Sequence, residues 1–194
     1  MIPAPRILAL AALGVAASLA LAPTRAAAQV KVIDEVKVGV LGHDVGFLTH
    51  HVEGGADVNL EMLFTSPEAL RIIGSPRPHI GADINTAGNT SDGYLGLTWG
   101  ITLVPSLFGG GAVFANGSLG GAVQDGFTGT TTSVAPPGRK LLGSVALFRE
   151  SLELGYQITP IVSVSALLDH ISNANLAPRN AGITSAGARL GFKF

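Results

Sequence analysis

The amino-acid sequence predicts an all-β protein, an eight-stranded antiparallel up-and-down β-barrel that crosses a membrane. The chain is apolar, because only 13% of its 194 residues are charged, whereas about 25% is usual for a soluble domain. No stretch after residue 29 has the roughly 20 apolar residues that a spanning helix needs. A closed barrel is the other membrane structure in which every backbone polar group is paired. A soluble β-domain is the alternative.

The N-terminal residues have the order of a secretory signal peptide. Arg6 supplies a positive region, residues 7–22 are apolar, and the small residues Ala26-Ala27-Ala28 form a cleavage site. The apolar run is short for a membrane anchor, which is the alternative interpretation. We therefore expect residues 1–28 to be removed on export and residues 29–194 to form the barrel domain.

Eight strand-like stretches follow, separated by clusters of Gly, Asn, Pro and Asp that are typical of turns. Eight is an allowed even number for a single-chain outer-membrane barrel. Strands of about 9–11 residues leave enough chain for turns and a few long loops, among them the Thr-, Gly- and Pro-rich run 127–138. The stretches are roughly residues 35–45, 52–64, 77–87, 92–103, 107–123, 140–157, 160–172 and 183–194.

The last stretch alternates between apolar and polar residues. Leu190 and Phe192 share one face, and Arg189 and Lys193 share the other. A period of two is the pattern of a barrel strand with a lipid face and a polar interior. The same parity extends over the last three stretches and directs their even-numbered residues toward lipid. Three polar residues interrupt that outward set and need an explanation: Glu150, His170 and Ser172.

His170 and Ser172 are the pair that predicts chemistry. Residues two apart on a strand leave the same face, about 7 Å apart, and a His beside a Ser is the basis of nucleophilic ester hydrolysis. Both termini of an even-stranded barrel lie on the periplasmic side. The strand before the last therefore runs outward, and the pair lies at the outer-leaflet rim. There it faces the ester-linked acyl chains of the lipid A of lipopolysaccharide.

A family resemblance rests on the same segment. Residues 170–174, His-Ile-Ser-Asn-Ala, resemble the H-x-S-N-A motif of the lipid A 3-O-deacylase family, also called outer-membrane acyloxyacyl hydrolases. Asn180 and Gly182 match the N-x-G that follows this motif, and residues 147–156 are similar to the family as well. The resemblance implies an eight-stranded barrel that removes an ester-linked acyl chain from lipid A without a cofactor.

By position, the resemblance implies that His170 is the base, Ser172 the nucleophile and Asn173 a residue of the oxyanion hole. The family's acidic residue lies two positions after the Gly of N-x-G, where this sequence has Thr184. A hydroxyl does not stabilise an imidazolium as a carboxylate does. Three alternatives remain open: a Ser–His dyad, a substitute carboxylate, or a degenerate, non-catalytic structural barrel.

Glu150 is the candidate for a substitute acid. Alternation directs it outward like His170, and the turn near residues 157–160 folds its strand back beside the strand of His170, within the barrel stagger. One alternative is a Glu150 at the headgroup level that binds a cation or Arg149. Asp169 is closer to His170 in sequence, but it points into the lumen.

The expected partners are lipid A, the outer membrane and the barrel assembly machinery, because the terminal Phe194 resembles the signal that barrels present to that machinery. The acidic excess that remains without Arg6 and Arg25 argues against a nucleic-acid partner. The chain has no Cys, and we expect neither a metal nor a cofactor.

The other histidines and the aromatic residues are weaker indications of a functional site than His170 and Ser172. His43, His50 and His51 fall at a strand end and turn, where we expect solvated loop side chains and no metal site. The remaining candidates are aromatic residues of the membrane interface, namely Tyr94, Trp99 and Tyr156.

Overall fold

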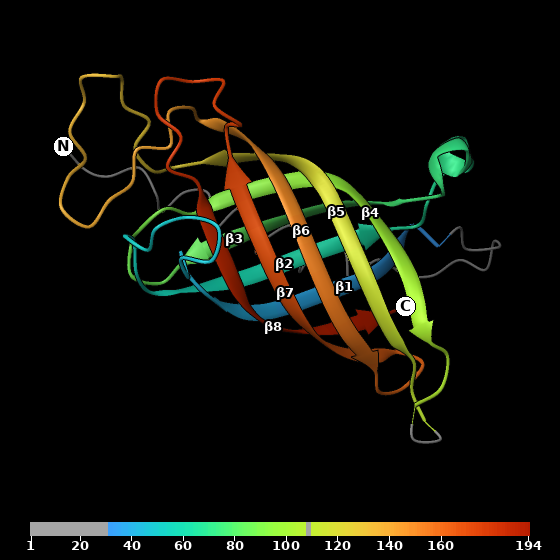
Figure 1. Ribbon diagram of the computed structural model, residues 1–194. Coiled ribbons are helices and arrows are strands. Elements are labelled where there is room, and N and C mark those ends of the chain that lie inside the picture. Colours follow the sequence, from blue (N-terminus) through green and yellow to red (C-terminus); the bar gives the residue numbers. More distant parts are fainter. Residues whose placement is uncertain (1–30, 108–109) are drawn as a thin grey trace, which may run out of the picture. The chain divides into compact units, whose positions relative to one another are not determined.

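The computed structural model describes residues 31–107 and 110–194, and residues 32–194 form one compact unit. Antiparallel strands close into an eight-stranded barrel, in which the last strand pairs with the first (Figure 1). The predicted fold class is thereby confirmed, while the expected signal peptide, residues 1–28, lies outside the described residues. The strands are β1 (Ile33–Gly42), β2 (Ala56–Phe64), β3 (Arg77–Asn85), β4 (Asp92–Val104), β5 (Val113–Gln124), β6 (Ala146–Gln157), β7 (Val162–Ser172) and β8 (Ile183–Lys193).

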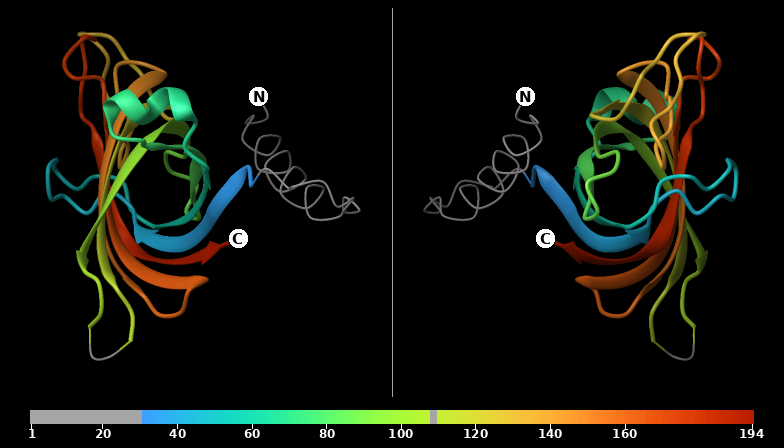
Figure 2. Two further views of the ribbon diagram at one scale, coloured as in Figure 1. Left: turned by 90° about the vertical axis from the view of Figure 1, so that its right-hand side faces the viewer. Right: turned by 90° about the vertical axis from the view of Figure 1, so that its left-hand side faces the viewer.

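The two ends of the barrel carry different connections. Phe194 shares one end with the connections 65–76, 105–112 and 158–161. The opposite end, which we call the loop end, carries loop 1 (43–55), loop 2 (86–91), loop 3 (125–145) and loop 4 (173–182). Viewed toward the ends of the barrel, the strands curve into a ring around the interior (Figure 2).

Helical structure is slight. The connection between β2 and β3 contains a short 3₁₀ helix, η2 (Glu68–Ile73). Within the part of the chain that is described, no helix is long and apolar enough to cross a membrane.

Side chains alternate between the two faces of the strands, as the sequence predicts. On β6, Phe148 and Leu152 are exposed on the outer face, whereas Arg149 and Glu153 are buried in the interior. The burial patterns of β7 and β8 keep the same parity over most of their length. The even-numbered residues of the last three strands therefore form the outer face, which carries the apolar side chains of a membrane barrel.

The interior is filled by paired charges. Arg189 lies 3.2 Å from Glu61 and 2.8 Å from Glu153, and all three side chains are buried. Arg149 lies 2.6 Å from Asp169. Because a buried charge is tolerated when it is paired and hydrogen-bonded, these contacts explain how a polar row can line the inside of a closed barrel.

Tyr94 is buried in this interior, so the expectation that it belongs to an interface belt is wrong. Its hydroxyl accepts a hydrogen bond from Asn59 Nδ2 at 2.9 Å. The Arg149 guanidinium lies 3.6 Å from the centre of its ring, a cation–π contact. Gly81 leaves the space for the ring, because a Cβ at that position would lie 2.4 Å from Tyr94 Cζ.

Four strands begin later than predicted, the second and the seventh by four and two residues and the fifth and the sixth by six residues each. The fifth starts at Val113, since the Leu107 N–H donates to the Gly111 carbonyl at 2.8 Å and so takes Gly111 out of the strand ladder. The sixth starts at Ala146 because residues 140–145 belong to loop 3, within which the Leu142 N–H donates to the Phe127 carbonyl.

Candidate active site

His170 lies on β7 between two neighbours that the sheet register places directly beside it. Glu150 on β6 is its partner on one side, and Thr184 on β8 is its partner on the other. All three are even-numbered positions of the outward row, close to the loop end. The register therefore brings together the predicted base, the candidate substitute acid and the residue at the family's acid position.

The imidazole of His170 is hydrogen-bonded to Thr184, with 2.8 Å between Nδ1 and Oγ1. Thr184 is fully buried although its row faces outward, because loop 1 lies against it. The Val45 N–H of loop 1 donates to the Thr184 carbonyl at 2.7 Å. Thr184 thus forms the hydrogen bond with Nδ1 that an acidic residue forms in a triad. Nε2 remains as the ring nitrogen that can accept a proton.

Ser172 lies two residues beyond His170 on the same face, opposite Phe148 of β6. It lines a groove of about 380 Å³ on the outer face, together with Leu119, Phe148, Glu150 and Ala174. Among the described residues, Ser172 forms no hydrogen bond with His170. Contacts of this kind often tighten only when substrate binds. The groove places a hydroxyl beside apolar walls, an arrangement suited to an ester of a long acyl chain.

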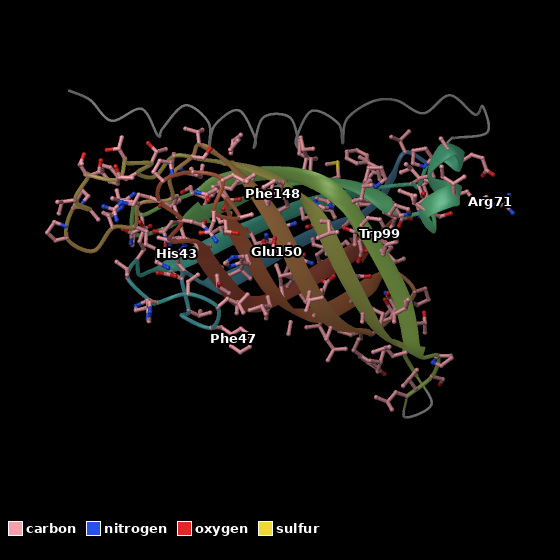
Figure 3. The ribbon with its side chains drawn as sticks, turned by 45° about the horizontal axis from the view of Figure 1, so that its top comes forward. His43, Phe47, Arg71, Trp99, Phe148 and Glu150 are labelled. Carbon is pink, nitrogen blue, oxygen red and sulfur yellow. The ribbon has the colours of Figure 1, made fainter. Side chains whose placement is uncertain are left out.

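Glu150 projects from the outer face of β6 into this groove (Figure 3). Its side chain is exposed, and within residues 31–107 and 110–194 it forms no hydrogen bond or ion pair. Arg149, the alternative partner that the sequence suggested, points the other way and pairs with Asp169. The carboxylate is therefore available on the same face as His170.

Asn173 turns inward and binds the loops. Its Nδ2 donates to the carbonyl oxygens of Leu142, at 2.7 Å, and Arg179. Its backbone N–H donates to Asn180 Oδ1 at 2.9 Å. All of its donors are thus engaged with loops 3 and 4, and the resulting contacts hold the turn that follows Ser172.

A buried ion cluster at the loop end was missed by the sequence analysis. Lys140 of loop 3 places its Nζ 2.5 Å from Asp44 Oδ1 of loop 1, 2.8 Å from the Gly182 carbonyl of loop 4 and 3.1 Å from Thr49 Oγ1. We call these contacts the Lys140 clamp. A Cβ on Gly182 would lie 3.1 Å from His170 Cε1, so the clamp fixes backbone that lies beside the His170 imidazole. No sequence pattern links residues 44 and 140.

His43 belongs to the same end and is buried, so the expectation of a solvated loop histidine is wrong for this residue (Figure 3). Its Nδ1 lies 2.8 Å from Asp57 Oδ2 and its Nε2 lies 3.4 Å from Glu53 Oε2. Burial by itself lowers the pKa of His43, but the two carboxylates outweigh it and raise the pKa to about 9. His50 and His51 are exposed, as expected.

Glu53 shows the complementary effect. Burial by itself raises its pKa, but the hydrogen bond with His43 and the backbone N–H groups of Lys140 and Thr90 lower it to about 2. In the described part of the chain, no three or more His, Cys, Asp or Glu side chains are arranged to hold a metal ion.

Comparisons with known proteins concern the family and the fold. A family model described as lipid A 3-O-deacylase (PagL) matches residues 68–193. The crystal structure of the outer membrane enzyme PagL is similar with a TM-score of 0.60 and 15% identity, over 82% of this chain and 99% of that one. No curated protein sequence matches the chain.

Two further barrels are more distant. Neisserial surface protein A has a TM-score of 0.48 and 11% identity, over 82% of this chain and 96% of that one. The Yersinia pestis outer membrane protein Ail has a TM-score of 0.46 and 10% identity, over 84% of this chain and 99% of that one. At such identities the structural likeness concerns the fold.

Proposed function

The chain belongs to the lipid A 3-O-deacylase family, and we propose that it is an outer-membrane serine esterase that removes an ester-linked acyl chain from the lipid A of lipopolysaccharide. The observation that carries the proposal is the outward-facing His170, whose Nδ1 is bound by Thr184 while Ser172 lines the adjacent apolar groove. The chain is exported by residues 1–28, and its terminal Phe194 is presented to the barrel assembly machinery.

The reaction uses Ser172 as nucleophile and His170 as base. Ser172 Oγ attacks the ester carbonyl carbon while His170 Nε2 takes the hydroxyl proton. The intermediate collapses, the bond to the sugar oxygen breaks, and His170 returns the proton to that oxygen. Water then attacks the acyl-serine by the same path and releases the fatty acid.

Thr184 and Glu150 together supply the two functions of an acidic residue in a triad, which are orientation of the imidazole and a negative charge near it. In the tautomer with an unprotonated Nε2, the Nδ1–H group of His170 donates to Thr184 Oγ1, which fixes the ring orientation. Thr184 has no negative charge, and Glu150, beside His170 on β6, supplies one on the lipid-facing side. A carboxylate close to an imidazolium favours the charged form.

Asn173 is the residue that the resemblance assigns to the oxyanion hole. Its Nδ2 donates to two loop carbonyls. One of these hydrogen bonds therefore has to break before the Nδ2 group can donate to the oxyanion of the substrate. Its second role is to hold loop 4 behind Ser172.

The proposal is tested by mass spectrometry of lipid A from cells that express the protein or its Ser172→Ala variant. The wild type should remove one hydroxyacyl group, and the variant should leave lipid A intact while its folded barrel keeps the same heat-modifiable gel migration. Ser106→Ala, in an exposed turn at the opposite end, is the matched control and should retain activity. Identical lipid A with and without the protein would favour the structural barrel instead.

A further inference from the structure

A second groove lies at the loop end, between loops 1, 3 and 4. We call it the rim groove; its volume is about 620 Å³. Its lining includes three cationic side chains, Arg139, Lys140 and Arg179, and no carboxylate. His50 lies on one wall, beside Thr49, whose hydroxyl already donates to Asp44 Oδ1 at 3.3 Å. Such a lining is suited to an anionic ligand.

Two of the three cations already have acidic partners. Lys140 is bound to Asp44 through the clamp described above. Arg139 Nε lies 3.3 Å from Glu53 Oε1, and its guanidinium stacks over Phe127 with 5.0 Å to the ring centre. The positive charge of both residues is therefore compensated within the protein.

Arg179 differs from these two. Its Nε and Nη2 donate only to backbone carbonyls of loop 3, those of Thr130, Thr131 and Ser133, at 2.7–3.0 Å. Among the described residues it forms no ion pair, and its Nη1 forms no hydrogen bond. Arg179 is thus a fixed guanidinium with an uncompensated charge and one free nitrogen. Because its orientation is already held, it loses little conformational freedom when an anion binds.

Loop 4 connects the rim groove to the groove of the outer face that Ser172 lines. The Arg179 carbonyl accepts a hydrogen bond from Asn173, which directly follows Ser172. Asn180, in the rim groove, accepts a hydrogen bond from the Asn173 backbone N–H. A single ligand with an anionic head and an acyl chain can therefore reach both grooves across one turn.

We propose that the rim groove binds a phosphate group of the acylated lipid substrate, with Arg179 as the phosphate-binding residue. The inference rests on the proposed function for the identity of the lipid. A phosphate monoester offers several strong acceptor oxygens to a guanidinium, and His50 lines the same groove. A phosphate bound at the rim places the ester linkage beside Ser172. Arg179 therefore raises the affinity of the protein for the phosphorylated lipid.

The test measures binding in the Ser172→Ala background, where no catalysis occurs. The probes are a phosphorylated lipid A and the same lipid after removal of its phosphates, both in detergent micelles. Arg179→Gln should weaken binding of the phosphorylated lipid about tenfold, the effect of losing one hydrogen bond to a charged group, and leave the dephosphorylated lipid unchanged. Arg71→Gln is the matched control, since Arg71 is exposed on η2 at the opposite end, and should change neither.

A measurement on the unsubstituted rim keeps the proposal testable if Arg179→Gln fails to fold. Salt should weaken binding of the phosphorylated lipid and not that of the dephosphorylated lipid. Equal losses for both lipids, or none, would overturn the proposal, and saturable binding of inorganic phosphate at lipid-like affinity would assign the groove to free phosphate instead. Because binding is read without turnover, its failure is distinguishable from an absence of deacylation in the lipid A assay.

Discussion

Thr184 Oγ1 lies 2.8 Å from Nδ1 of His170, across the register pair that joins β7 to β8. A neutral hydroxyl therefore holds the imidazole at the position where the family has a carboxylate. In the proposed reaction, orientation of the ring and stabilisation of its charge, which a single acid supplies in a triad, come from two different residues. The first three predictions below follow from the contacts around this ring.

Replacing Thr184 tests its orienting role. Thr184→Val preserves the shape and removes the hydrogen bond, so kcat should fall about 2- to 10-fold, the equivalent of a neutral hydrogen bond. Thr184→Glu should raise kcat above the wild type, because a carboxylate stabilises the imidazolium. Position 184 is fully buried, so the larger side chain costs stability, and kcat is compared per folded molecule. Full activity in Thr184→Val would contradict an orienting role; Thr102→Val, on exposed β4 surface, is the control.

Glu150→Gln tests the substitute acid. If Glu150 stabilises the imidazolium, kcat should fall roughly a hundredfold, because the positive charge that forms on His170 then lacks a carboxylate on the neighbouring strand. The assay is release of fatty acid from lipid A in detergent. Glu68→Gln removes a carboxylate from the exposed η2 helix and should have no effect. Unchanged activity in Glu150→Gln would leave a Ser–His dyad or a degenerate barrel.

The Lys140 clamp can be examined with a double-mutant cycle. Lys140→Met leaves the buried Asp44 without its cation, and loss of one partner of a buried pair costs about 3–5 kcal/mol. The thermal midpoint should fall, and kcat should fall with it because Gly182 is released beside His170. Lys140→Met combined with Asp44→Asn should recover part of the midpoint. Additive losses in the double variant would show that the two residues are not coupled.

The loop end should lose stability as the pH rises from neutral to alkaline. The pKa of His43 is about 9 in the folded protein and 6.5 in its ordinary state. The contacts of His43 with Asp57 and Glu53 therefore stabilise the fold fully below about pH 6.5, and this contribution is lost as the pH rises through 9. The thermal midpoint, followed by circular dichroism, should decline over that window. The decline should be smaller in His43→Gln; an equal decline would assign it to other groups.

Deletion of Phe194 should reduce insertion into the outer membrane and leave the activity of each folded molecule unchanged. The side chain is 70% exposed, and its backbone N–H donates to the Asp34 carbonyl, so little packing is lost. The site lies at the opposite end of the barrel. The measurement is the membrane-fraction yield together with activity normalised to folded protein, and a normal yield would speak against recognition of the terminal residue.

The sequence by itself determined the strand count and the two faces of the barrel, and it placed Glu150 near His170 on the neighbouring strand, within the barrel stagger. Alternation has a period of two and needs no distant contact, so Arg189 and Leu190 could be assigned to opposite faces directly. The register of Glu150 with His170 follows from a short turn between consecutive strands, since a short turn limits how far two strands can slip.

Only the tertiary structure decided the contacts made when the barrel closed. Lys140 and Asp44 are 96 positions apart in loops without periodicity, and closure of the sheet brings those loops together. Tyr94 resembled an interface residue because its side chain has both an apolar ring and a hydroxyl; the space left by Gly81 and the charge of Arg149 placed it inside. The sequence predicted a solvated His43 because its contacts with Asp57 and Glu53 form only in the folded barrel. Local alternation encodes the direction of a side chain, whereas its partners depend on which distant segments the closed barrel brings beside it.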